Sequence, residues 1–119
     1  MTREARNALE VFENSYELFK SVIESVGPSL FEIGRGADPD RRRIDKRYDH
    51  VIYGPGELDS DIAAKVESML VKAFAANPHY NTKAAQHGGG GCPLKGGQWI
   101  YLVWNGNECE DGCSIHSKT

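Results

Sequence analysis

Apolar residues recur every three or four positions in two long stretches of the chain, a spacing that predicts amphipathic helices. The first stretch covers residues 3–26 and ends at Gly27-Pro28, a pair that stops a helix. The second covers residues 60–76. The positions expected to be buried are Ala5, Leu9, Phe12, Tyr16, Phe19, Ile23 and Val26 in the first helix, and Ile62, Ala63, Val66, Met69, Leu70, Ala73 and Phe74 in the second.

Shorter apolar runs predict three β-strands, at residues 29–34, 49–53 and 99–104. The last run, Trp-Ile-Tyr-Leu-Val-Trp, has the composition of a strand at the centre of a sheet. A short and very polar helix is predicted between the first two strands, at residues 39–47. We therefore expect an α+β fold with a small, three-stranded, antiparallel sheet packed with helices.

A chain of 119 residues with 39% apolar and 26% charged residues is typical of one soluble globular domain. Within it we expect the N-terminal helix at 3–26, an α+β core at 29–104 and a polar tail at 105–119. No apolar run is long enough to span a membrane, and the N-terminus lacks the pattern of a signal peptide. We therefore expect a cytoplasmic protein without a membrane partner.

Charge is segregated along the chain, although the net charge of −3 argues against tight, nonspecific nucleic-acid binding. Six basic side chains lie between positions 35 and 47, together with three aspartates. The basic residues are Arg35, Arg41, Arg42, Arg43, Lys46 and Arg47. A guanidinium at the start of a helix can hold a phosphate bidentately. The alternative is a solvated helix face, offset by Asp38, Asp40 and Asp45.

The turn before these arginines has the residues of a strand-to-helix connection. Gly34 and Gly36 permit positive φ and a close approach of the backbone. Asp38 is expected to cap the short helix, and Pro39 suits its first position, where a missing N–H costs nothing.

The segment Glu32–Gly34, followed by a loop with a proline and then by Arg42, resembles the second motif of the GIY-YIG nuclease superfamily. In that family a strand ends in Tyr-Ile-Gly or Lys-Ile-Gly and leads to a helix with the catalytic arginine. The helix that carries Glu67 continues the resemblance, because Glu-Ser-Met-Leu-Val-Lys-Ala-Phe matches the family's Glu-x-x-Leu-Ile-x-x-Phe. Asn81, followed by the glycines at 88–91, is similar to the asparagine and glycine-rich segment found after this helix in the family.

The resemblance implies a DNA-binding endonuclease that hydrolyses phosphodiester bonds with a metal ion. Arg42 would stabilise charge on the phosphate, Glu67 would hold Mg²⁺ or Mn²⁺, and Tyr101 or Tyr48 would position water. The substrate would be bound by Arg35, Arg41, Arg43 and Asn81.

Two features differ from the family pattern. The family's first strand, with Gly-Ile-Tyr, is replaced by the helix at 3–26, and Glu32 stands where the second motif has a tyrosine. The segment Trp99–Tyr101 resembles the missing strand. We hypothesise that it fills that place in the sheet, as in a circularly permuted relative, with its tyrosine near the arginine and the glutamate. If the tyrosines are lost, the alternative is a relative that keeps the fold without the activity.

The C-terminal part of the chain contains a candidate zinc site. Its ligands would be Cys92, Cys109, Cys113 and His116, with His87 as a substitute. Free thiols are the alternative. The glycine run at 88–91 either cradles an anion through its backbone N–H groups or forms a flexible loop.

Two further functions stay open. One is a non-enzymatic module that captures a nucleotide or another phosphorylated ligand through the basic stretch. The other is an interaction protein of a phage or bacterial conflict system, held by the helix at 3–26, which also offers a homodimer contact. Taken singly, Glu67 as a surface carboxylate, Asn81 as a turn residue and Tyr101 as a core residue have structural explanations.

Overall fold

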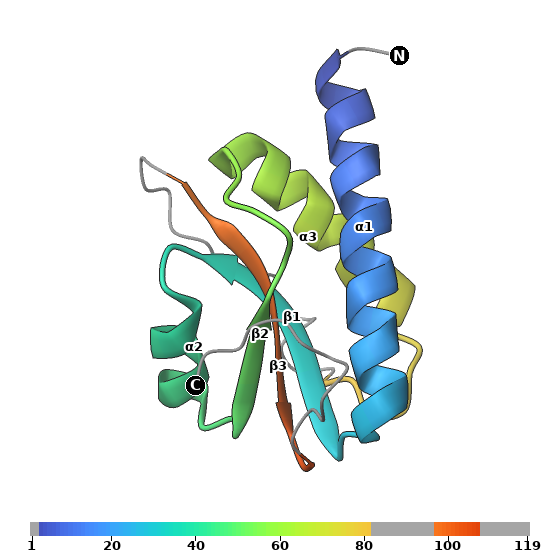
Figure 1. The fold of residues 1–119 in the computed structure, drawn as a ribbon, viewed down its shortest axis with the longest axis vertical. Coiled ribbons are helices and arrows are strands. Elements are labelled where there is room, and N and C mark those ends of the chain that lie inside the picture. Colours follow the sequence, from blue (N-terminus) through green and yellow to red (C-terminus); the bar gives the residue numbers. More distant parts are fainter. Residues whose placement is uncertain (1–2, 82–96, 108–119) are drawn as a thin grey trace.

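The computed structural model of the protein describes residues 3–81 and 97–107. The expected α+β fold with a three-stranded antiparallel sheet is confirmed (Figure 1). The helices are α1 (Arg3–Val26), α2 (Pro39–Lys46) and α3 (Ser60–Phe74), and the strands are β1 (Leu30–Gly36), β2 (His50–Tyr53) and β3 (Trp99–Asn105). Each boundary lies within two residues of its predicted place.

The strand that comes last in the sequence lies in the middle of the sheet, between β1 and β2. It is antiparallel to both neighbours, so Gly34 of β1 lies opposite Tyr101, and Val51 of β2 lies opposite Val103. Every residue from 100 to 104 is buried. The prediction of a central strand is therefore confirmed.

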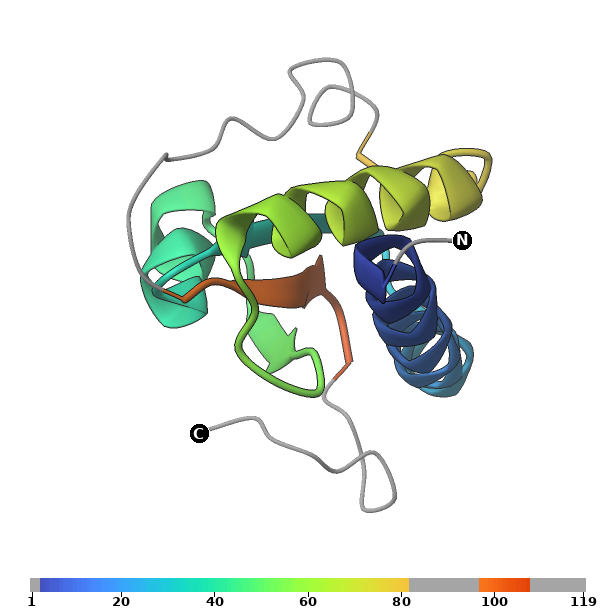
Figure 2. The same cartoon turned by 90° about the horizontal axis from the view of Figure 1, so that it is seen from above.

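The helices lie on both sides of the sheet. Figure 2 shows α1 and α2 on opposite sides, with α3 passing along the side of β1. Apolar residues of α1, α3 and one sheet face form the main core, among them Phe19, Val66 and Leu102. A smaller cluster lies on the opposite sheet face, where α2 packs, and contains Tyr48, Val51, Tyr101 and Val103.

The ends of the helices follow the predicted signals. Gly27 has a φ of +57° and ends α1. The carboxylate of Asp38 accepts a hydrogen bond from the backbone N–H of Arg41 at 3.2 Å, and Pro39 is the first residue of α2. Arg47 ends α2 in the left-handed region with a φ of 65°. The sequence signals thus place α2 directly after β1.

The buried faces of the two long helices differ in part from the predicted ones. Leu9 of α1 and Ala73 of α3 are exposed, whereas Ser15 is fully buried. The reason is that α1 contacts α3 and the sheet together, and the contact line follows Ala8, Ser15, Phe19, Val22 and Val26. Among the helices of the described residues, none is long and apolar enough to cross a membrane.

Candidate functional site

The ring of Tyr101 lies over Gly34 of the neighbouring strand. A Cβ atom at position 34 would be 2.5 Å from the Tyr101 hydroxyl oxygen and 2.7 Å from Cζ, so no larger residue fits without a shift. Gly34 has no positive φ, nor does Gly36. The left-handed backbone that these two glycines permit is therefore not used, whereas the missing side chain of Gly34 allows the close approach of the Tyr101 ring.

Arg42 lies over the next glycine on the same face of β1. A Cβ atom at Gly36 would be 3.4 Å from the Nε of Arg42 and 3.8 Å from its Cγ. Positions 32, 34 and 36 alternate along the strand and share the face on which α2 packs. The arginine predicted to be catalytic is thus half-buried against the sheet.

Arg42 and Tyr101 act on each other electrostatically. Burial raises the pKa of the Tyr101 phenol above its usual range, and the charge of Arg42 acts in the opposite direction. The charges of Glu32 and Glu67 raise this pKa further. Within the described residues the Tyr101 hydroxyl forms no hydrogen bond. The phenol therefore stays protonated at neutral pH, and its hydrogen has no acceptor within the described residues.

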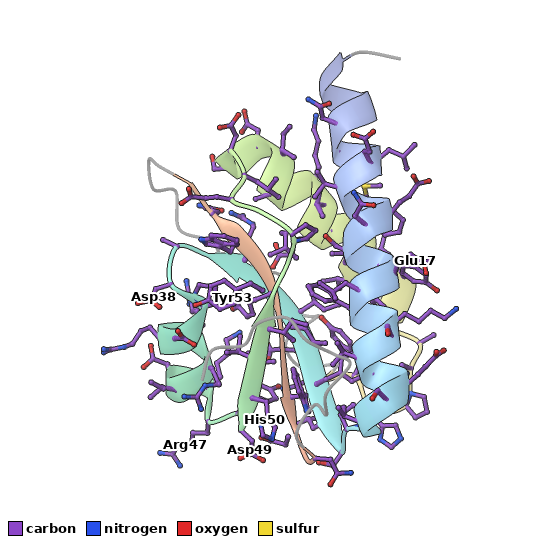
Figure 3. The ribbon with its side chains drawn as sticks, in the orientation of Figure 1. Glu17, Asp38, Arg47, Asp49, His50 and Tyr53 are labelled. Atoms are coloured by element: carbon purple, nitrogen blue, oxygen red, sulfur yellow. The ribbon has the colours of Figure 1, made fainter. Side chains whose placement is uncertain are left out.

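Most of the basic side chains around Arg42 are already engaged. Three ion pairs join Arg35 to Glu67 at 3.0 Å, Arg41 to Asp45 at 3.2 Å, and Lys46 to Glu32 at 2.6 Å. Arg43 donates a hydrogen bond to the carbonyl oxygen of Tyr48. Arg47 is exposed at the end of α2 and points away from the sheet (Figure 3).

Arg42 differs from these neighbours, because no ion pair or side-chain hydrogen bond engages its guanidinium within the described residues. A half-buried cation without a carboxylate partner is a natural place for an anion.

Glu67 is buried on α3 and contacts the end of β1. Its Oε1 accepts a hydrogen bond from the Nε of Arg35 at 3.0 Å, and the Nη1 of Arg35 donates to the Oε1 of Gln98 at 2.8 Å. Burial raises the pKa of the Glu67 carboxyl, and its hydrogen bond with Arg35 opposes this. The pair was not predicted: the sequence suggested a metal ligand in Glu67 and a substrate ligand in Arg35.

A second polar network lies on the α2 side of the sheet. Glu32 is 3% exposed and accepts hydrogen bonds from the Nζ of Lys46 at 2.6 Å and the hydroxyl of Tyr48 at 2.8 Å. The Nδ2 of Asn81 donates to the same hydroxyl at 3.0 Å. The hydroxyl of Tyr48 thus has two hydrogen-bond partners. Of the two tyrosines suggested to position water, Tyr101 is the one whose hydroxyl has no such partner within the described residues.

The predicted site residues lie in several separate places. Arg42 and Tyr101 lie together, Glu67 and Arg35 form an ion pair, and Asn81 reaches this region through Tyr48. Arg41 and Arg43 lie on α2 with the partners given above. The proposed zinc ligands Cys92, Cys109, Cys113 and His116, together with His87 and the glycines at 88–91, lie outside the described residues.

Lys46 and Gln98 are site neighbours that sequence reasoning missed. The signal for Lys46 was a lone carboxylate, Glu32, between the apolar residues Phe31 and Ile33 of a strand, because such a buried charge needs a partner. Gln98 carried no such signal.

Few side chains that could bind a metal ion lie close together in the described part of the chain. Among the described residues, no group of three or more histidine, cysteine, aspartate or glutamate side chains lies close enough to hold an ion. The Oε2 of Glu67 has no hydrogen-bond partner there. One carboxylate oxygen fits Mg²⁺, which commonly keeps several waters and binds proteins through one or two carboxylates plus substrate phosphates.

Comparisons of this chain with protein-family models, with curated proteins and with solved structures gave no match.

Proposed function

We propose that this protein hydrolyses phosphodiester bonds in nucleic acid with the help of a divalent cation, as its resemblance to the GIY-YIG superfamily implies. The observation that supports this most directly is that the charges of two of the implied residues act on the third, Tyr101. Its phenol is influenced by the charge of Arg42 from α2 and by the charge of Glu67 from α3. These are the residue types that the chemistry needs, and they come from three separate elements.

Each side chain has a role that matches its surroundings. The guanidinium of Arg42 binds a phosphate oxygen and stabilises the extra negative charge of the transition state. The protonated hydroxyl of Tyr101 orients a water by hydrogen bonding rather than removing its proton, because its pKa is raised. Glu67 would hold the cation, which neutralises phosphate charge when bound.

The test is cleavage of labelled duplex DNA, single-stranded DNA and RNA in Mg²⁺ or Mn²⁺. We expect cleavage by the wild type, lost on chelation, and a fall of about 100-fold or more in Arg42→Ala and Glu67→Gln. Arg47→Gln is the matched control. It removes an exposed arginine from the end of the same helix, and we expect its rate to stay near that of the wild type. Absence of cleavage of all three substrates by the wild type would refute the proposal.

The Arg35–Glu67 ion pair favours a second candidate. A carboxylate that already pairs with a guanidinium is a weaker cation ligand. The sheet face on which α2 packs, with Arg42 over Gly36, would then serve as a binding module for a phosphorylated ligand. In that case pyrophosphate or a nucleotide, titrated by calorimetry, binds without turnover. Binding is then lost in Arg42→Ala and kept in Glu67→Gln, whereas cleavage needs both residues.

A further inference from the structure

The short helix α2 is held on the sheet by polar contacts more than by apolar burial. Pro39 is its only buried residue, and its single aliphatic side chain after Pro39, Ile44, is 58% exposed. The hydroxyl of Tyr53 donates to Asp40 at 3.0 Å, and Figure 3 shows Tyr53 beside Asp38 at the start of the helix. At the other end of α2, Lys46 binds Glu32.

Lys46 and Arg42 are four residues apart on α2 and therefore share one helix face. Their partners on β1, Glu32 and Gly36, are also four residues apart and share one strand face. Lys46 lies on Glu32 and Arg42 lies over Gly36. With these two contacts, α2 runs antiparallel to β1 and the guanidinium of Arg42 lies over Gly36.

Glu32 is well suited to fix Lys46. It is almost fully buried, and the hydroxyl of Tyr48, itself bound by Asn81, occupies its other oxygen. The carboxylate therefore has little freedom to rotate away from the ammonium group. Because the pair is neutral overall, Lys46 contributes anchoring without adding net charge to the anion site.

We propose that Glu32 and Lys46 are positioning residues that place Arg42 over Gly36 and beside Tyr101. The ion pair between Lys46 and Glu32 holds α2 on the sheet, where apolar contacts would otherwise do so. The placement itself does not depend on the proposed function; only its consequence for phosphate binding rests on that function.

Two NMR readouts test this in the free protein and with inorganic phosphate as the probe. The first is the NOE between the Hα of Gly36 and the Hγ of Arg42, which reports the placement without any ligand. The second is the shift of the Arg42 Nε–Hε signal during phosphate titration, with the signal assigned from its absence in Arg42→Lys. The variants are Lys46→Gln, Lys46→Arg, Glu32→Gln and, as a matched control, Arg41→Gln.

We expect Lys46→Gln to lose the NOE and to weaken the phosphate response about tenfold, since a small displacement of a binding group costs this much or more. Lys46→Arg keeps the ion pair and should restore both readouts. Arg41→Gln removes the same charge from a surface pair and should weaken the response about twofold or less.

Retention of the NOE in Lys46→Gln, in a protein with wild-type thermal stability, would overturn the inference. Equal phosphate weakening in Lys46→Gln and Arg41→Gln would also overturn it, since charge alone would then explain the effect. Glu32→Gln serves as the independent variant on the strand side. An NOE that behaves as expected, with no phosphate response in the wild type, would instead count against the proposed function.

Discussion

Tyr101 on the central strand and Gly34 on the outer strand β1 are register partners, and the phenol ring covers the glycine. A Cβ atom at position 34 would lie 2.5 Å from the hydroxyl oxygen. The charge of Arg42 lowers the pKa of the same phenol. The contact between Tyr101 and Gly34 is therefore part of both the sheet packing and the candidate site.

Gly34→Ala should destabilise the fold by about 2 kcal/mol, because the added methyl group displaces the Tyr101 ring from a packed face. Urea unfolding measures this. Gly56→Ala is the control, since no heavy atom lies within 4 Å of a Cβ atom there, and its stability should change by less than about 0.5 kcal/mol. In a Tyr101→Ala background the cost of Gly34→Ala should largely disappear. If Gly34→Ala lowered the free energy of unfolding equally in the wild type and in Tyr101→Ala, the loss would come from the backbone at position 34 and not from the Tyr101 ring.

The two arginines of the site should differ in their effect on stability. Arg35→Ala leaves the buried Glu67 without its partner and should cost about 2 kcal/mol, less than a fully buried pair because both side chains are partly solvated. Arg42→Ala removes no ion pair and should change the free energy of unfolding by less than about 0.5 kcal/mol. Thermal and urea unfolding of the two variants give the comparison. A large loss in Arg42→Ala would assign it a structural role.

Tyr80 closes the outer edge of β1, and its hydroxyl accepts a hydrogen bond from the backbone N–H of Ile33 at 3.1 Å. Tyr80→Phe should leave this buried donor unsatisfied at a cost of about 1–3 kcal/mol. Hydrogen–deuterium exchange should show faster exchange of the Ile33 amide. Tyr16→Phe is the control, since the Tyr16 hydroxyl forms no hydrogen bond within the described residues. Unchanged exchange at Ile33 would contradict this account of the edge.

The helices and strands could be predicted because each depends on local information. The three-to-four spacing of apolar residues predicted α1 and α3, and the caps Asp38 and Gly27 are short-range signals. The composition of residues 99–104 also indicated a central strand. Which strands it pairs with depends on the whole chain, and no local pattern specifies this.

The site was less predictable, because its interactions join residues far apart in sequence. Arg42 and Glu67 were singled out by motif, but the motif did not show that Arg35 pairs with Glu67, 32 positions away. Glu32 was noted as a departure from the family pattern. Its partnership with Lys46 requires the return of α2 across β1, which no local pattern specifies.

Alkaline pH should unfold the protein as its buried phenols ionise. Burial raises the pKa of Tyr80 to about 12 and that of Tyr53 to about 12, and it raises the pKa of Tyr48 and Tyr101 above their usual range. A raised pKa in the folded state means that stability is fully present below the unfolded value of 10.0 and is lost as pH rises through the folded value.

Tyrosinate absorbance and circular dichroism, followed together against pH, test this. The two signals should change in one cooperative transition, and Tyr80→Phe should make the loss of stability with pH less steep. Ionisation of these four tyrosines near 10.0 with the circular dichroism unchanged would show that the phenols are accessible in the folded state.

The central position of β3 has a consequence for synthesis on the ribosome. β1 and β2 pair with β3 and not with each other. A nascent chain that has not yet reached residue 99 holds both outer strands without the partner that joins them. Assembly of the sheet therefore waits for most of the chain, and contacts of such large sequence separation are slow to form. A stalled or truncated product would expose two unpaired strands to chaperones and proteases.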